Sequence, residues 1–186
     1  WLIILPGTVE RFCAAVRERG IAPRGVKFLG AMADLIPPQQ IADVTALMRA
    51  PFSNTFGATE TGLPPASAGI LAIGQVPKSL AKTISTLCEI RLVDADDRDV
   101  LDGEAGELAI RGPTLFSGYW NAPEATAHDF RGGWFHMGDV FRRNPDGTLS
   151  FVDRVKYMIK SGGENIYPAE IERVLLSDPR VVEAVV

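Results

Sequence analysis

Side chains able to do chemistry gather in four short segments that are richer in polar residues and glycine than a plain connection requires. The first segment, residues 56–62 (FGATETG), follows a predicted strand, at the end where ligands of open α/β sheets gather. Gly57 and Gly62 would let the backbone approach a ligand, two hydroxyls could donate to phosphate oxygens, and the Glu60 carboxylate could hold Mg²⁺. A capped loop without a ligand explains this segment, taken alone, equally well.

The other three segments lie in the second half of the chain, and each has a simple structural alternative. Residues 133–139 (GWFHMGD) end in Asp139, which could accept two hydrogen bonds from a ribose diol, although such an aspartate is more often a turn residue. Residues 153–156 (DRVK) are charged, which also suits a solvated linker. Residues 160–168 (KSGGENIYP) form a glycine-rich turn that leads into a helix.

Composition and motifs exclude several classes of protein. The net charge of −4 gives no electrostatic reason to expect a nucleic acid or an anionic membrane as partner. No apolar run approaches the roughly 20 residues that span a bilayer. No GxxxxGK[ST] phosphate loop occurs, and neither His128 nor His136 lies in a recognisable hydrolase pattern. Cys13 and Cys88 have no metal-ligand spacing and are predicted to be buried, reduced thiols, which fits a cytoplasmic protein.

Apolar spacing predicts an α/β region that is followed by an antiparallel β region. In the first region helices are predicted over residues 9–19 and from Pro38 to Pro51, alternating with strands at 26–29 and 52–56, which favours a mostly parallel sheet. After residue 73 the predicted elements are short strands separated by turns, at 87–93, 106–111, 140–143 and 148–152.

Turn residues mark the connections in the last third of the chain. The sequence NPDG at 144–147 is a strong hairpin connection, because proline sets φ at the second position and glycine supplies the positive φ that closes the turn. Beyond residue 154 we expect a Gly-Gly hairpin and then a helix that Pro168 opens, with Ile171, Val174 and Leu175 directed inward.

The order and spacing of the four segments, together with GELAIRGP at 106–113 and SGYW at 117–120, resemble the adenylate-forming superfamily. This superfamily includes acyl- and aryl-CoA synthetases, luciferases and the adenylation domains of peptide synthetases. The stretch 159–172 looks like the acyl-CoA ligase form of the hinge, whereas peptide synthetases usually carry a basic residue where Glu164 stands. The resemblance runs from about Lys27 to the end of the chain.

The resemblance implies a two-step reaction that makes a carboxylate electrophilic. ATP and Mg²⁺ give an acyl-adenylate and pyrophosphate, and the thiol of CoA then displaces AMP. On the matching positions, Thr59 and Thr61 would contact the α-phosphate and Glu60 would hold the magnesium. Phe56 stands where the family often has tyrosine and would pack on adenine, which keeps the stacking face but loses a phenol. The loop residues Gly57 and Ala58 would complete this side of the nucleotide site.

Other site residues follow from the same resemblance. Asp139 and Arg154 would hold the ribose hydroxyls. Lys156 would be the pivot about which a C-terminal lid rotates between the two half-reactions, and Lys160 is a further catalytic candidate. Gly163 would line the channel for the pantetheine arm of CoA, where a side chain would block the thiol. The turn Gly30-Ala31-Met32 would line the adenine and acyl pocket.

The implied fold class is α/β plus β, in three parts. Residues 1–73 would form an incomplete parallel α/β lobe, 74–153 a distorted antiparallel β-barrel, and 154–186 the hinge with the first hairpin and helix of an α+β lid. Both ends of the sequence read as continuing strands, so we expect an internal part of a longer ligase. The family's phosphate loop would lie upstream and its adenylation lysine downstream, so the isolated chain should be inactive. Its uncovered apolar edges should make it self-associate.

Two alternatives stay open at this level. One is an adenylate-forming enzyme that does not use CoA, such as a luciferase-like enzyme or a peptide-synthetase adenylation domain. The other is a noncatalytic module that keeps the fold. For the ligase, the expected partners are ATP, CoA and a carboxylic acid, fatty or aryl, whose identity the sequence leaves open because much of the pocket would be built upstream.

Overall fold

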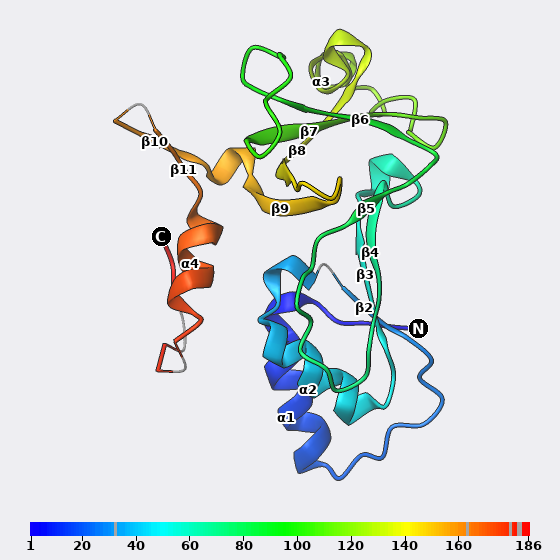
Figure 1. The fold of residues 1–186 in the computed structure, drawn as a ribbon. Coiled ribbons are helices and arrows are strands. Elements are labelled where there is room, and N and C mark those ends of the chain that lie inside the picture. The colour runs from blue at the N-terminus through cyan, green and yellow to red at the C-terminus, as the bar shows by residue number, and fades with distance from the viewer. Residues whose placement is uncertain (32, 163, 179, 182–183) are drawn as a thin grey trace. The chain divides into compact units, whose positions relative to one another are not determined.

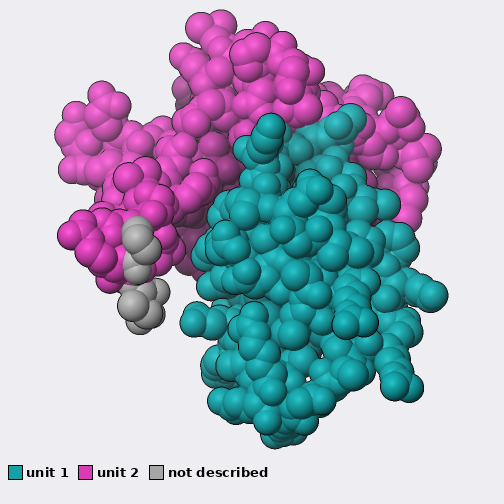
Figure 2. Space-filling model, turned by 60° about the horizontal axis from the view of Figure 1, so that its bottom comes forward, with its two compact units in different colours: residues 1–56, 66–83 teal, residues 57–65, 84–186 magenta. Residues whose placement is uncertain are grey.

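A computed structural model describes residues 1–31, 33–162, 164–178, 180–181 and 184–186. The chain divides into two compact units, which Figure 2 colours separately. Unit 1 comprises residues 1–56 and 66–83, and unit 2 comprises residues 57–65 and 84–186.

Unit 1 is a β-α-β-α-β arrangement extended by two further strands (Figure 1). Strands β1, β2 and β3 pair in parallel, and β4 is antiparallel to β3, in a sheet of order β1-β2-β3-β4-β5. The elements are β1 (Leu2–Ile3), α1 (Val9–Glu18), β2 (Leu29–Ala31), α2 (Pro38–Met48), β3 (Phe52–Phe56), β4 (Ala66–Leu71) and β5 (Thr83–Ile84). The predicted α/β character of this region is confirmed.

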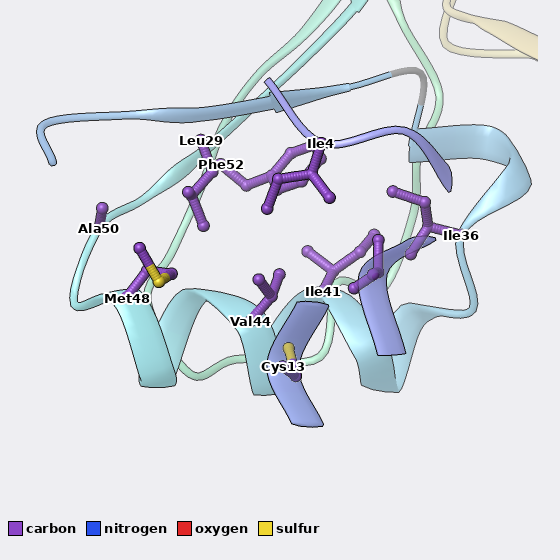
Figure 3. Packing of buried hydrophobic residues seen from close by; sticks show 10 residues of the cluster. Ile4, Cys13, Leu29, Ile36, Ile41, Val44, Met48, Ala50 and Phe52 are labelled. Carbon is purple, nitrogen blue, oxygen red and sulfur yellow. The ribbon is translucent and has the colours of Figure 1, made fainter. Parts of the chain in front are cut away.

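Helices α1 and α2 pack their apolar faces against one side of the parallel strands (Figure 3). Ile41 and Val44 of α2 lie beneath Leu29 and Phe52 of the sheet, and all four side chains are buried. Helix α2 starts at Pro38, where a proline costs nothing because the first-turn N–H groups have no intrahelical partner. The predicted strand at 26–29 starts three residues later, at Leu29, in register with Phe52.

The segment after β4 folds back onto unit 1 and does not begin a new domain at residue 74. The N–H of Gly74 donates to the Thr45 hydroxyl of α2 at 2.9 Å. Lys82 is fully buried, and its Nζ donates to Asp34 Oδ1 at 2.6 Å. Burial lowers the pKa of Lys82, and the Asp34 carboxylate opposes that shift. These contacts keep residues 72–83 on the first unit.

Unit 2 contains a four-stranded antiparallel sheet of order β6-β7-β8-β9. Its elements are β6 (Glu89–Val93), β7 (Ala105–Arg111), the helix α3 (Pro123–Asp129), β8 (Phe135–Arg143) and β9 (Leu149–Arg154). The predicted hairpin connection is present between β8 and β9, where Gly147 has φ +81°. The sheet is open and not a closed barrel, because within the described residues β6 pairs with β7 alone and β9 with β8 alone.

The last elements are a short hairpin and a helix. Strands β10 (Ile159–Ser161) and β11 (Glu164–Ile166) pair antiparallel and lead into α4 (Pro168–Leu175). The N–H of Ala169 donates to Asp153 Oδ2 at 2.9 Å, which anchors the start of α4 to β9. Within the described part of the chain, no helix is long and apolar enough to cross a membrane.

The prediction that the apolar face of α4 points inward is wrong. Ile171, Val174 and Leu175 are exposed, Val174 by 71%. The apolar spacing does form one side of the helix, but no element of the described residues packs over that side.

Removal of the Asp34 carboxylate should destabilise unit 1 strongly. In the Asp34→Ala chain Lys82 becomes a buried cation without its counter-ion, so the free energy of unfolding should fall by about 3–5 kcal/mol. Urea titration followed by circular dichroism measures this change. The matched control is Asp96→Ala, which breaks an exposed pair with Arg98 and should cost less than about 1 kcal/mol. Equal, small losses in both variants would contradict the structural role of the buried pair.

Candidate functional site

The loop at residues 57–65 is closed by its own hydroxyl and lies within unit 2. Thr59–Thr61 form a single 3₁₀ turn. The Thr61 hydroxyl donates to the Ala58 carbonyl at 2.8 Å and accepts from the Ala58 N–H at 3.2 Å. Thr61 is buried and Thr59 is exposed. In this arrangement the Thr61 hydroxyl bonds within the loop, while Thr59 presents its side chain outward.

A second segment of unit 2 holds this loop in place. Gly62 has φ +66°, and a Cβ there would lie 2.7 Å from the Thr114 carbonyl oxygen, so no other residue fits this close approach. The N–H of Phe116 donates to the carbonyl of Glu60 at 2.9 Å. The loop therefore has a fixed position relative to residues 114–119.

The Glu60 side chain meets Tyr119, a residue with no predicted role. The Tyr119 hydroxyl lies 3.3 Å from Glu60 Oε1 and 3.0 Å from Asp129 Oδ2, so it bridges two carboxylates. Burial, followed by the bond to Asp129, raises the pKa of Tyr119 to about 12, which keeps its proton available for donation. The only sequence signal was the SGYW motif, whose tyrosine had no assigned role.

Glu60 is the candidate magnesium ligand, and its surroundings suit that ion. No group of three or more histidine, cysteine or acidic residues among the described residues could enclose a metal. Mg²⁺ does not need such a cage, because it is commonly held by one or two carboxylates together with substrate phosphates and water. One half-buried carboxylate beside an exposed Thr59 fits this mode of binding.

Asp139 and Arg154 are brought together across β8 and β9. They are direct partners in the register of the two strands, and Arg154 Nε donates to Asp139 Oδ1 at 3.1 Å. The Asp139 side chain is 4% exposed, and burial raises its pKa to about 6 against the opposing charge of Arg154. The preceding Gly138 has φ +71°, and the pairing of β7 with β8 is irregular at this point.

The Glu60 loop and Asp139 share strand β8 as an anchor. Phe116, whose backbone holds Glu60, packs edge-on against Phe135 at the start of β8, with ring centroids 5.3 Å apart. The Tyr119 ring lies 4.8 Å from the same Phe116 ring. Asp139 follows Phe135 on the same strand. Residues that are far apart in the sequence are thereby fixed to one element.

The residues predicted to form the hinge follow β9 directly. Lys156 lies in the 3₁₀ turn Val155–Tyr157, with Nζ 4.7 Å from the centre of the Tyr157 ring, and is exposed. Lys160 is an exposed residue of β10, opposite Asn165. Gly163, the predicted pantetheine residue, lies outside the described residues.

The remaining candidates belong to unit 1. Gly30 and Ala31 end strand β2, as the predicted strand-end turn requires, and Met32 lies outside the described residues. Phe56 is the last residue of β3, and its ring is 1% exposed. A ring so covered has no free face for a base, so the predicted stacking on adenine requires it to be uncovered first.

Comparison with known proteins decides the family. The pattern that defines the AMP-binding enzyme family matches residues 2–120, more than half of the chain. The chain belongs to this family. The resemblance to the adenylate-forming superfamily is confirmed, and the match takes in the Glu60 loop, with Asp139 and Arg154 lying beyond it.

Individual relatives are CoA ligases. Indoleacetate–CoA ligase of Aromatoleum aromaticum is 33% identical over 99% of this chain and 36% of its own length. 2-Succinylbenzoate–CoA ligase of Geobacillus kaustophilus is 42% identical over 72% of this chain and 27% of its own. The chain thus spans about a third or less of the length of these relatives.

A solved structure agrees with the sequence relatives. The o-succinylbenzoate CoA synthetase of Bacillus subtilis with its acyl-adenylate intermediate superposes with a TM-score of 0.70, at 28% identity over 98% of this chain and 37% of that one. The same enzyme has been solved with ATP and a magnesium ion, with a TM-score of 0.65. The predicted fold class, part of the adenylate-forming fold, is confirmed.

The raised pKa of Asp139 makes a prediction about stability. The carboxyl titrates near pH 6 in the folded chain and near its ordinary 3.8 when unfolded. Between these values the folded chain binds the extra proton, so the unsubstituted chain loses stability as pH rises. Asp139→Asn removes this loss, and its advantage in free energy of unfolding should grow by roughly 2 kcal/mol from about pH 4 to about pH 7.

Urea unfolding at several pH values measures this difference. Asp102→Asn, which changes an exposed carboxylate of the same unit, should give a difference that is flat with pH. A flat difference for Asp139→Asn as well, or one that falls as pH rises, would contradict the assignment of a raised pKa.

Proposed function

We propose that this chain is part of an AMP-forming acid–CoA ligase and carries one side of its nucleotide site together with the hinge. In the complete enzyme, ATP and Mg²⁺ convert a carboxylic acid to its acyl-adenylate with release of pyrophosphate. The thiol of CoA then attacks the acyl carbon, and AMP leaves. The observation that carries this proposal is the buried Asp139–Arg154 pair in a chain whose relatives are CoA ligases.

The Asp139–Arg154 pair suits a ribose diol. An ionised carboxylate accepts several hydrogen bonds, and Arg154 Nε uses one position on Oδ1. Two vicinal hydroxyls can donate to the carboxylate while Arg154 compensates its charge. Burial makes such bonds stronger than they would be in water, so the pair favours a nucleotide that keeps both hydroxyls.

The Glu60 loop takes the phosphate side in this proposal. Thr59 and Thr61 contact the α-phosphate, as the family resemblance implies, and the Thr61 hydroxyl also closes the loop on Ala58. Glu60 holds Mg²⁺, which when bound neutralises charge on the phosphate oxygens. Tyr119 keeps the Glu60 side chain in place by donating to it.

The roles of the remaining residues rest on the family resemblance. Gly30, Ala31, Met32 and Phe56 line the adenine and acyl side. Lys156 is the pivot of a lid, Lys160 is a catalytic candidate that moves with that lid, and Gly163 leaves room for the pantetheine arm.

The acid is fatty or aryl. Both branches are represented among the relatives, since some are named for the aromatic acids 2-succinylbenzoate and indoleacetate and others for medium- or long-chain fatty acids. The family resemblance assigns the phosphate loop and the adenylation lysine to other parts of a longer protein, and this chain spans about a third of the length of such a relative. The thiols of Cys13 and Cys88 are free, which agrees with the proposed cytoplasmic location.

Catalytic activity should differ between the 186-residue chain and a longer protein that contains it. The 186-residue chain should give no ATP–pyrophosphate exchange with any acid of a fatty and aryl panel, because oriented donors that each contribute about 10²–10³ in rate are missing. A longer protein that contains it should release AMP in a CoA-dependent manner. In that protein Asp139→Ala should raise the KM for ATP roughly tenfold or more, from loss of a charge-assisted hydrogen bond.

A matched control variant accompanies the Asp139→Ala measurement, and three results would contradict the proposal. Asp102→Ala, which changes an exposed carboxylate, should leave the KM for ATP unchanged. Robust exchange by the 186-residue chain would refute its incompleteness. AMP release by the longer protein without thioester formation would favour an adenylate-forming enzyme that does not use CoA, and no reaction with any acid would favour a noncatalytic module.

Self-association of the isolated chain is a further prediction. Strand β1 has only β2 as a neighbour among the described residues and exposes Ile3, while β4 exposes Ile70 by 64%. Unpaired strand edges and apolar side chains of this kind favour pairing between chains. Light scattering at increasing concentration should show a mass above that of one chain, and a strictly monomeric mass at high concentration would contradict the prediction.

A further inference from the structure

Strand β8 carries a bulge where Asp139 lies. Glu107 of β7 pairs with Val140, and Ala109 pairs with His136, so the single residue 108 stands opposite residues 137–139. Gly138 occupies the left-handed region with φ +71°, which few residues other than glycine adopt. A bulge interrupts the ladder and leaves backbone groups that need other partners.

The Glu107 side chain supplies the missing partner. Its Oε1 accepts the N–H of Gly138 at 3.1 Å. Its Oε2 accepts from Arg131 Nη2 at 2.8 Å and lies 3.3 Å from His136 Nδ1. One carboxylate of β7 therefore contacts the middle of the bulge at Gly138, the flanking residue His136 and one cation.

Arg131 is fixed in turn from its other side. Its Nε donates to both carboxylate oxygens of Asp97, at 3.2 and 3.1 Å. Asp97 has φ +59°, an uncommon conformation for a residue other than glycine, in the turn between β6 and β7. Arg131 thus lies between two carboxylates, and Glu107 has no freedom to leave the bulge without breaking this chain of contacts.

We propose that Glu107 is a positioning residue that maintains the β8 bulge and thereby presents Asp139 to the ribose of the bound nucleotide. The inference rests on the proposed function, because the ribose role of Asp139 belongs to it. If the ladder ran on regularly from the Glu107–Val140 pair, Asp139 would stand opposite Leu108. The bulge instead places three residues, 137–139, opposite Leu108, so the position of Asp139 along the sheet depends on the contacts that hold the bulge.

Amide exchange tests the first half of the inference in the 186-residue chain. Glu107→Ala should speed exchange of the Gly138 N–H by roughly tenfold or more, because a bond to a charged acceptor is lost. Glu107→Gln retains an oxygen that can accept this N–H and should show a smaller effect. Glu89→Ala is the matched control, since Glu89 lies on β6 of the same sheet and pairs with Arg111 at the surface. Unchanged exchange in Glu107→Ala would overturn the inference.

Nucleotide selectivity tests the second half. The ratio of the dissociation constants for 2′,3′-dideoxy-AMP and AMP, measured by calorimetry, should be roughly ten or more in the unsubstituted chain and in Glu89→Ala. It should fall toward one in Asp139→Ala and in Glu107→Ala. A general loss of packing would weaken both ligands together and leave this ratio unchanged, so the ratio reports positioning and not stability.

The outcomes separate the two proposals. If the unsubstituted chain shows no preference for AMP, or Asp139→Ala keeps it, the ribose role in the proposed function fails and the inference falls with it. If Asp139→Ala abolishes the preference while Glu107→Ala keeps it, only the inference fails. Should Glu107→Ala not fold, Glu107→Gln decides, with a partial loss of preference supporting the inference and an unchanged ratio with unchanged Gly138 exchange overturning it.

Discussion

Burial of the Asp139 carboxylate is the constraint on which the candidate site depends. A buried charge is costly unless it is paired and hydrogen-bonded, and here the pairing comes from Arg154 on the neighbouring strand. The register of β8 with β9 must therefore be held, because a slip of one residue would turn Arg154 to the other face of the sheet. The turn at residues 144–147 sets the register next to the hairpin, and an irregularity between Val140 and Phe141 shifts it by one residue before the Asp139–Arg154 pair.

The Glu60 loop is also held in place by specific partners, but these lie far away in the sequence. Its backbone and side chain meet partners about sixty residues away, in the segment that contains Phe116 and Tyr119. That segment is fixed by ring packing onto Phe135, the first residue of β8. Strand β8 thus supports both the Glu60 loop and the buried Asp139 carboxylate. A change in the packing at Phe135 would therefore affect both, although they belong to separate sequence motifs.

The sequence predicted the parts of the fold that depend on neighbouring residues. Helix α2 followed from its apolar spacing and Pro38, and β3 was predicted at the residues where it is found. The types and positions of the polar loop residues could likewise be recognised in the sequence motifs. Two long-range pairs could not be predicted: Lys82 with Asp34, 48 residues apart, and Tyr119 with Glu60, 59 residues apart. The neighbouring residues in the sequence do not indicate which distant group each side chain contacts.

Sequence and structure differ because the residue type sets which contacts a side chain can make, whereas its surroundings in the fold determine which of them it does make. Thr61 has the hydroxyl that a phosphate contact needs, but the loop uses it to bond Ala58. Val174 has the apolar side chain that a core needs, but no described element covers it. Glu107 has a charge that usually lies in solvent, yet its position opposite the bulge gives it three partners. The residue types of the candidate site are therefore found in short sequence motifs. Their geometry is set by the buried polar groups around them, each of which needs a hydrogen-bond partner.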